Sequence, residues 1–334
     1  MCRGSLAFRT VSGQKEPLTY QCRVARFRDS ALMCNLLEVD SWFMLFQPQP
    51  VLLQRDAMMP SGRADESETQ YVLGHSEEEL ERLRTQARLI DPITQRFFYE
   101  AGIKPGMYVL DVGCGAGDTT MLLGEMIGES GGVVGVDRAA GAIAAARAKG
   151  RERANLTFIQ GDPSEMRFDR AFDAVVGRYV LMFQSHPATM LRSLASHLRP
   201  GGLIAFHELD YRGITSSPSL PTFDRLTHWT AETTRLYGAD PHMGAKLLAA
   251  FVTAALPTPS VRVEALSAKG ADSADLLLLM RNLTRSLLPE MERRGVASRA
   301  EVDVDTLFDR MYGEAVATDS VVVGHLQVAA WCRV

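Results

Sequence analysis

The sequence predicts an α/β fold with a doubly wound parallel sheet and a nucleotide-type site at one edge of it. Across residues 109–206, five short apolar runs are separated by turns and by sequence with helical character. The first run, Val109 to Val112, leads directly into a loop with three alternating glycines at 113–117. Two later runs are followed by the acidic residues Asp137 and Asp162. In such a fold the carboxyl ends of the strands share one ligand crevice.

The glycine loop is the predicted ligand site. Gly113, Gly115 and Gly117 lack a Cβ atom, so the backbone can adopt positive φ and a ligand can lie directly against it. A helix is predicted from Thr119 to Ile127, because apolar residues recur there at helical spacing. A strand, a glycine turn and a helix N-terminus together are typical of a nucleotide-binding site.

The charges beside the loop distinguish two classes of ligand. A dinucleotide fingerprint has glycine or alanine where this chain has Asp118, next to a pyrophosphate. Asp118 and Asp111 would repel a diphosphate, whereas they suit a ligand with a sulfonium and an α-ammonium group. S-adenosylmethionine is such a ligand. Asp137 could hold the ribose diol of either cofactor, so a NAD-dependent oxidoreductase is the alternative.

The strands after the glycine loop end on residues that we expect at the same crevice. The second strand, Gly131 to Val136, is followed by Asp137. The third strand, Leu156 to Ile159, is followed by Asp162, whose carboxylate could accept a hydrogen bond from an adenine amino group.

The fourth and fifth strands are predicted at Phe172–Gly177 and Leu203–Phe206. Helical crossovers are predicted at 138–149 and 187–198. Arg178, at the end of the fourth strand, either fixes a carboxylate of cofactor or substrate or pairs with a neighbouring acid.

Five motifs follow one another from the first strand to the fifth: Val-Leu-Asp-Val-Gly-Cys-Gly-Ala-Gly, Gly-Val-Asp, Gly-Asp, Phe-Asp-Ala-Val-Val and Arg-Pro-Gly-Gly. In this order they resemble the motifs of class I S-adenosylmethionine-dependent methyltransferases, over roughly residues 71–211. The stretch Tyr71-Val-Leu-Gly-His-Ser76, together with Gln86, resembles the lead-in of bacterial small-molecule members related to ubiquinone and menaquinone methyltransferases.

The resemblance implies a Rossmann-like sheet of seven strands with an antiparallel last strand, and S-adenosyl-L-methionine as the cofactor. Residue patterns and resemblance together predict a cofactor site formed by Tyr71, Gln86, Asp111, Gly113, Cys114, Gly115, Gly117, Asp137, Arg138, Asp162, Pro163 and Arg178.

Four segments are predicted along the chain. In residues 1–57, basic residues outnumber acidic ones in the first 28 positions, and we expect a non-native or disordered extension before a natural start near Met58. A transit peptide is the alternative for this segment. Residues 58–102 are predicted to form N-terminal cap helices, 103–211 the cofactor-binding core, and 212–334 a helical cap plus strands six and seven.

The N-terminal cap is predicted to contain two helices. A capping box, Ser76-x-x-Glu79, opens the first helix. Asp91-Pro92 is expected to end it and to start the second, because proline lacks the backbone N–H that a helix interior needs.

The C-terminal segment is predicted to be largely helical around a sixth strand at Val261–Leu266, with a last strand at Ser320–Trp331. The expected helices are 222–237, 243–256, 272–294 and 303–316. Because they are inserted on both sides of strand six, we expect them to form a cap over the substrate.

Two residues at the end of the fifth strand are candidate general bases. His207 is the first candidate and Glu208 the second, since a hydroxyl acceptor benefits from a base during methyl transfer. The alternative for His207 is a hydrogen-bonded histidine near the sheet edge. Successive strand residues point to opposite faces, so these two side chains are not expected to share a metal ion, and no metal site is predicted.

Composition favours a small-molecule enzyme. The net charge is -4, which is unlike a nucleic-acid-binding protein, and the longest apolar stretches are too short to span a membrane. Five cysteines without a C-x-x-C pair fit a reducing cytoplasm. We therefore expect methylation of a small molecule, at oxygen rather than nitrogen or carbon, by a cytoplasmic enzyme that could be a homodimer. The alternatives are a cofactor-binding regulatory or assembly protein and the NAD-dependent oxidoreductase.

Overall fold

The computed structural model describes residues 77–334, with side chains from Gln86 onward. All described residues belong to one compact unit. The predictions for residues 1–57 and for Tyr71 concern residues outside this range.

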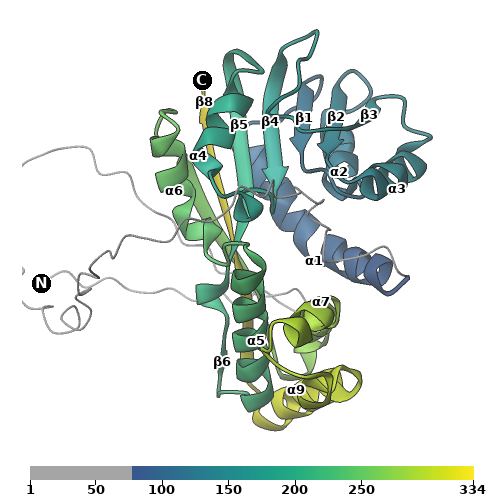
Figure 1. Cartoon of the computed structure of the whole chain (residues 1–334), viewed down its shortest axis with the longest axis vertical. Helices are drawn as coiled ribbons and strands as arrows, with labels where there is room; N and C mark the ends of the chain where they lie inside the picture. Colours follow the sequence, from purple (N-terminus) through teal and green to yellow (C-terminus); the bar gives the residue numbers. More distant parts are fainter. Residues whose placement is uncertain (1–76) are drawn as a thin grey trace, which may run out of the picture. The chain divides into compact units, whose positions relative to one another are not determined.

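In residues 77–334, eight strands form one sheet (Figure 1): β1 (Tyr108–Val112), β2 (Gly132–Asp137), β3 (Leu156–Gln160), β4 (Phe172–Arg178), β5 (Leu198–Asp210), β6 (Thr215–Ser217), β7 (Ser260–Lys269) and β8 (Val321–Arg333). The order is β3-β2-β1-β4-β5-β8-β6, and β7 also pairs with β8. Strands β1 to β5 are parallel, whereas β8 is antiparallel to β5, β6 and β7. The doubly wound sheet with an antiparallel last strand is confirmed, and the short β6 is an addition to the seven predicted strands.

The helices are α1 (Glu77–Ala101), α2 (Asp118–Ile127), α3 (Ala140–Gly150), α4 (Pro187–Ala195), α5 (Pro221–Tyr237), α6 (Met243–Thr253), α7 (Ala274–Arg293), α8 (Arg299–Val302) and α9 (Val304–Thr318). Within the described residues, 3-10 turns follow three of the strands: η1 (Leu181–Phe183) lies between β4 and α4, η2 (Tyr211–Gly213) between β5 and β6, and η3 (Gly270–Ser273) between β7 and α7. Side chains of α1 and α2 pack with one face of the central strands, and side chains of α4 and α6 pack with the other. Because both faces are covered, the central strands are apolar almost throughout.

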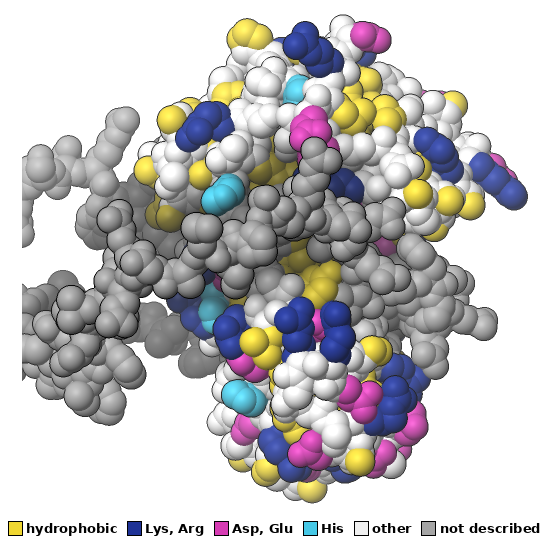
Figure 2. All heavy atoms as spheres, in the orientation of Figure 1, with side chains coloured by type: hydrophobic (Ala, Val, Ile, Leu, Met, Phe, Trp, Pro, Cys, Tyr) yellow, Lys and Arg dark blue, Asp and Glu magenta, His cyan; other side chains and the backbone are white. Residues whose placement is uncertain are grey.

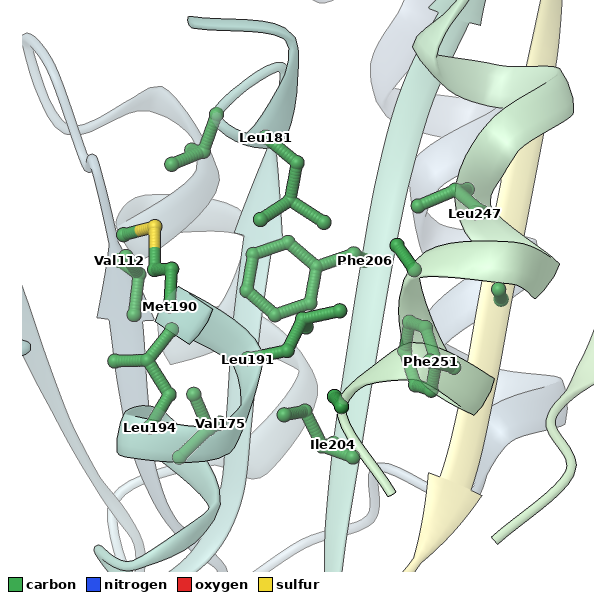
Figure 3. Close-up of a cluster of buried hydrophobic side chains, with 14 of the residues drawn as sticks. Val112, Val175, Leu181, Met190, Leu191, Leu194, Ile204, Phe206, Leu247 and Phe251 are labelled. Atoms are coloured by element: carbon green, nitrogen blue, oxygen red, sulfur yellow. The ribbon is translucent and has the colours of Figure 1, made fainter. Parts of the chain in front are cut away.

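Phe206 of β5 lies in the core on the α4 and α6 face (Figure 3). Leu191 of α4 and Leu181 of η1 point toward its ring, and Leu247 and Phe251 of α6 extend the same cluster. All five side chains are fully buried. This cluster fixes η1, which follows β4, against the end of β5.

Helix α1 is continuous where two helices were predicted. Pro92 lies inside it and is exposed, whereas Ile90 and Ile93 are almost fully buried and Phe97 follows on the same face. A proline in a helix interior costs about 3 kcal/mol. Burial of each large apolar side chain contributes about 1.5 to 3 kcal/mol, so the packed face outweighs this cost.

In the segment predicted to be a helical cap, α5, α7, α8 and α9 enclose an apolar cluster of their own that includes Leu226, Leu277 and Leu307, and we call these four helices the cap. Figure 2 shows basic and acidic side chains mixed over the lower part of the view, where Figure 1 has α5 and α9. Helix α6, expected in the cap, instead packs on the sheet through Met243, Leu247 and Phe251. The second expected cap helix is therefore part of the core.

Candidate cofactor site and the adjoining polar network

The glycine loop has the backbone conformation that its sequence requires. Gly113, Gly115 and Gly117 all have positive φ, at 65°, 53° and 86°. A Cβ atom on Gly113 would lie 2.7 Å from Val180 Cγ2, whereas a Cβ on Gly115 would meet no atom within 4 Å. Gly113 is thus needed for close packing beneath the loop, and Gly115 borders open space that a ligand could fill.

Asp111 is the penultimate residue of β1, next to this loop. Its Oδ2 accepts a hydrogen bond from Thr120 Oγ1 at 2.6 Å, while its buried Oδ1 has no hydrogen-bond partner among the described residues. Burial raises the pKa of this carboxyl to about 7. A buried acceptor without a donor costs about 1–3 kcal/mol, so a ligand that brings a donor or a positive charge would be stabilised here.

Asp137 connects the end of β2 to the glycine loop. Its Oδ2 accepts from the backbone N–H of Gly115 at 2.9 Å, and its Oδ1 accepts from the N–H of Ala139 at 2.9 Å. Each carboxylate oxygen retains a further lone pair. Asp137 is therefore positioned both to hold the loop and to accept hydrogen bonds from a diol.

Asp162 follows β3 and forms an ion pair with Arg138, which follows β2. Its Oδ1 also accepts from the backbone N–H of Ser164 at 2.8 Å. Although burial acts in the opposite direction, these contacts hold the pKa of Asp162 below its ordinary value. The neighbouring Pro163 is buried, and its carbonyl oxygen lies 2.8 Å from Nε2 of His197. Arg138 and Asp162, both predicted to contact the cofactor, thus pair with each other across adjacent loops.

Two residues of the loop region have a different environment from the one expected. Asp118 forms an ion pair with Lys149 of α3, so its charge is compensated and the case against a diphosphate depends more on Asp111. Cys114 is buried, and desolvation raises the pKa of its thiol. A ligand contact at position 114 would therefore use the backbone rather than a thiolate.

These observations fit an S-adenosylmethionine-type ligand. Open space beside Gly115, an unsatisfied carboxylate oxygen at Asp111 and a second carboxylate at Asp137 meet at the carboxyl ends of β1 and β2. Their combined negative character suits a positively charged ligand better than a pyrophosphate. Gln86 lies partly buried on α1, and Tyr71 lies outside the described residues.

A polar network extends from this site beneath α1. Arg178 Nη1 donates to Asp91 Oδ1 at 2.5 Å and to Thr94 Oγ1 at 3.2 Å. The Arg178 side chain is nearly buried, and the Asp91 side chain is about a quarter exposed. Arg178 was predicted either to fix a carboxylate of cofactor or substrate or to pair with a neighbouring acid. In the structure it pairs with the acid Asp91.

His207 is fully buried in the same network. Its Nδ1 lies 3.2 Å from Thr94 Oγ1, and its Nε2 lies 2.9 Å from Gln327 Oε1. Gln327 donates through Nε2 to the carbonyl of His325, and its Oε1 also accepts from Tyr179 Oη at 2.5 Å. We therefore assign the proton of the neutral imidazole to Nε2.

The expectation that His207 opens onto the crevice needs correction. Both ring nitrogens have partners inside the protein, and burial lowers the pKa of His207 to about 3. The surroundings are those of the hydrogen-bonded histidine considered as the alternative. A general-base role for His207 stays a prediction that this geometry does not favour.

Glu208 is also buried rather than open to the crevice. Its Oε1 accepts from the backbone N–H groups of Val180 and Leu181, at 2.9 and 2.7 Å. Burial raises its pKa to about 7. The side chain fixes η1 to β5, and it points away from the α1 side where His207 lies, as strand alternation predicted.

Sequence reasoning missed the network residues Asp91, Thr94 and Gln327. Gln327 offered a signal, since it is a polar residue inside the apolar run of the last strand. Thr94 offered none, because a threonine on a helix is ordinarily exposed.

Among the residues that the structure describes, no group of three His, Cys, Asp or Glu side chains could hold a metal ion. No helix in 77–334 combines the length and apolar character needed to cross a bilayer.

Residues 109–202 match the family described as "Methyltransferase domain". The curated demethylmenaquinone methyltransferase of Staphylococcus aureus (strain MRSA252) is 31% identical over 133 residues, which cover 40% of this chain and 53% of the relative. The demethylmenaquinone methyltransferase of Lactococcus lactis subsp. lactis (strain IL1403) is 30% identical and covers 48% and 58%. The chain thus spans little more than half the length of these curated relatives.

Among solved structures, a SAM-dependent methyltransferase from Aquifex aeolicus is 24% identical, with a TM-score of 0.37 over 42% of this chain and 76% of that one. A geranyl diphosphate methyltransferase in complex with SAM is 16% identical, with a TM-score of 0.44 over 78% and 93%.

The chain carries a class I S-adenosylmethionine-dependent methyltransferase domain. The two sequence relatives above are both named demethylmenaquinone methyltransferases.

Proposed function

We propose that this chain transfers the methyl group of S-adenosylmethionine to a hydroxyl group of a small molecule. The observation that carries the proposal is the unsatisfied Oδ1 of Asp111 beneath a glycine loop that borders open space. This arrangement suits the charged methionine part of the cofactor, and Asp137 suits its ribose. The cofactor supplies an activated methyl group when bound, and the protein contributes mainly by holding the acceptor in line with it.

We propose an aromatic hydroxy compound as the acceptor class. Two sequence relatives are named demethylmenaquinone methyltransferases, and a quinone is a ring compound, which supports a ring-bearing acceptor. A phenolic oxygen is a nucleophile that can accept a methyl group, which is consistent with the O-methylation expected from the sequence.

The first test is isothermal titration of the full 334-residue chain with S-adenosylmethionine, S-adenosylhomocysteine and NAD. We expect micromolar binding of the first two ligands and no binding of NAD. If NAD binds and S-adenosylmethionine does not, the charge argument at Asp111 is wrong and the proposal fails with it.

The ribose assignment has its own test. Asp137→Ala removes an acceptor for the diol and also the hydrogen bond that holds the Gly115 N–H. We expect at least a tenfold loss of S-adenosylhomocysteine affinity. The control is Asp169→Ala, which replaces an exposed aspartate between β3 and β4 and should leave this affinity unchanged. Equal affinity of the Asp137→Ala and wild-type chains would remove Asp137 from the site.

One observation favours a second candidate function. His207 and Glu208 are both held in internal hydrogen bonds, as expected of a cofactor-binding regulatory or assembly protein without transferase activity. Incubation with methyl-labelled S-adenosylmethionine and a panel of phenols and reduced quinones separates the two. Label transfer to any of them supports the transferase, whereas cofactor binding without transfer supports the regulatory protein.

A further inference from the structure

A histidine where the sheet core meets the helical cap has an unsatisfied ring nitrogen. His325 lies on β8 and is 7% exposed. Its Nε2 is buried and has no hydrogen-bond partner among the described residues. Natural structures rarely leave such a group without compensation, because its desolvation is then unopposed.

The backbone at this position directs the side chain in an unusual way. Gly324 and His325 of β8 lie opposite the single residue Leu266 of β7, so the strand contains a β-bulge. At the same point β8 changes neighbours, since it pairs with β5 from Leu326 onward and with β6 before Gly324. Bulges re-aim side chains and are frequent next to active sites.

His325 is connected to the carboxyl ends of the core strands. The Tyr211 ring, directly after β5, packs edge-on against the imidazole, with centroids 4.2 Å apart. Gln327 Nε2 donates to the His325 carbonyl, and Gln327 Oε1 accepts from Tyr179, directly after β4. In an open α/β sheet, ligands bind at these strand ends. His325 therefore contacts residues that directly follow β5 and, through Gln327, β4, on the side of the sheet where this rule places ligands.

Two tyrosines at these strand ends indicate what kind of molecule fits: Tyr211 contacts the His325 ring directly, and Tyr179 is linked to the His325 backbone through Gln327. Tyr211 Oη bonds to Thr234 Oγ1 of the cap helix α5 at 3.3 Å, and Tyr179 Oη bonds to Gln327. Since both hydroxyls have partners inside the protein, the tyrosines offer a ligand chiefly the carbon surface of their rings. That surface suits an aromatic ring.

The imidazole indicates which substituent this ring carries. Burial lowers the pKa of His325 to about 4, so its ring is uncharged at neutral pH. Nε2 then donates or accepts according to the tautomer. A hydroxyl group satisfies either tautomer, whereas an ether or a carbonyl oxygen satisfies only the one that donates.

We propose that Nε2 of His325 hydrogen-bonds the hydroxyl group of an aromatic acceptor and thereby determines specificity for hydroxylated rings. This inference rests on the proposed methyl transfer and assigns a residue to the acceptor side of that site. No other described histidine has a buried ring nitrogen without a partner.

The test uses three probes on the full chain saturated with S-adenosylhomocysteine: 1-naphthol, 1-methoxynaphthalene and naphthalene. They share one ring system and differ in hydrogen bonding. We expect 1-naphthol to bind about tenfold more tightly than the other two, measured by fluorescence titration. Equal affinities for all three, or no saturable binding of 1-naphthol, would overturn the proposal.

Two variants locate the effect. His325→Leu, which removes every hydrogen-bonding group of the side chain, should abolish the preference for 1-naphthol over 1-methoxynaphthalene, whereas His228→Leu, the same change at an exposed position of α5, should retain it. In ¹⁵N spectra of histidine-labelled protein, one imidazole resonance should shift with 1-naphthol but not with naphthalene, and it should be absent from His325→Leu. If His325→Leu keeps the preference, the hydroxyl is bound elsewhere and the proposal is wrong. Should that variant fail to fold, the probe series on the wild-type chain still decides.

The preliminary cofactor titration separates this inference from the proposed function. If S-adenosylhomocysteine does not bind, the proposed function fails. If it binds and the naphthalene series shows no hydroxyl preference, only the role of His325 fails.

Discussion

His207 is held on both sides by neutral partners, so its environment opposes protonation. Thr94 and Gln327 contact its two nitrogens, and the guanidinium of Arg178 adds positive charge nearby. Burial is the larger cause of the low pKa, which is about 3 compared with an ordinary value of 6.5. A proton that binds readily in the unfolded chain is therefore excluded from the folded one.

This exclusion predicts a pH-dependent stability. As the pH falls below 6.5, the unfolded chain takes up the proton first, so the folded state loses up to about 1.4 kcal/mol per pH unit until the folded pKa near 3 is reached. His207→Gln removes this contribution. We expect the free energy of unfolding of the wild type, relative to His207→Gln, to be about 2 kcal/mol lower at pH 5 than at pH 7.5, measured by urea unfolding. The exposed His186→Gln should follow the wild type at both pH values, and a wild-type difference that does not change with pH would contradict the assignment.

Asp111 presents the opposite case at the residue scale, since its pKa is raised to about 7 by burial. Its charge is costly in the folded chain, and this cost grows as the pH rises from the ordinary value of 3.8 through 7. We expect Asp111→Asn to raise the free energy of unfolding by about 1 kcal/mol at pH 8 and to lower S-adenosylmethionine affinity at least tenfold. Chemical unfolding and calorimetric titration measure the two effects, with the exposed Asp169→Asn as control. A variant that is more stable and binds as tightly would show that Asp111 has no ligand role.

At the scale of elements, the sequence predicted helices and strands whose signals are local, but it did not predict features that depend on packing against distant residues. The glycine loop, β1 and α2 could be predicted because their signals are local: an apolar run, glycines that require positive φ, and a helical period. The continuity of α1 through Pro92 could not, because it depends on burial of Ile90 and Ile93 against distant strands. Helix α6 was predicted as a helix but assigned to the cap, since an amphipathic period does not say which surface it covers.

Glu208 couples two elements, and its replacement should loosen one of them. Its carboxylate accepts from the N–H groups of Val180, Leu181 and Met182 at the start of η1. Glutamine retains one acceptor oxygen and sets an amide donor against these backbone donors. We expect Glu208→Gln to lower the free energy of unfolding by about 2 kcal/mol and to speed hydrogen exchange selectively at residues 180–182.

Mass-spectrometric hydrogen exchange measures the Glu208 effect directly. Glu165→Gln, an exposed glutamate in the loop after β3, serves as the matched control and should change neither exchange nor stability. Unchanged exchange at 180–182 in Glu208→Gln would mean that the apolar cluster around Leu181 alone holds η1 in place.

At the scale of the whole molecule, the candidate site combines what sequence could and could not predict. Asp111, Asp137 and Asp162 could be located from the ends of apolar runs, because parallel strands bring their carboxyl ends together. The network of Arg178, His207 and Gln327 joins β4, β5 and β8, and no spacing along the chain predicts such long-range contacts. The same holds for His325, whose position depends on a bulge in the pairing of β7 and β8.

Strand β8 continues from the core into the cap, and this continuity predicts how the described part of the chain unfolds. Residues 321–323 of β8 pair with β6, and Val322 belongs to the cap cluster, whereas the strand from Leu326 onward pairs with β5. Leu307→Ala removes a fully buried side chain from the cap cluster. We expect it to lower the free energy of unfolding by about 2–5 kcal/mol in a single calorimetric transition, because β8 transmits the loss to the core.

The control for this experiment is Val316→Ala on the same helix α9, where the side chain is 46% exposed and the expected change is within about 0.5 kcal/mol. Affinity for S-adenosylhomocysteine should stay the same in both variants, since the candidate cofactor residues lie at the ends of β1, β2 and β3. Two separate transitions in Leu307→Ala, with only the lower one shifted, would show instead that the cap unfolds independently. The acceptor site between cap and core would then open without loss of the cofactor site, and substrate release could be limited by the cap alone.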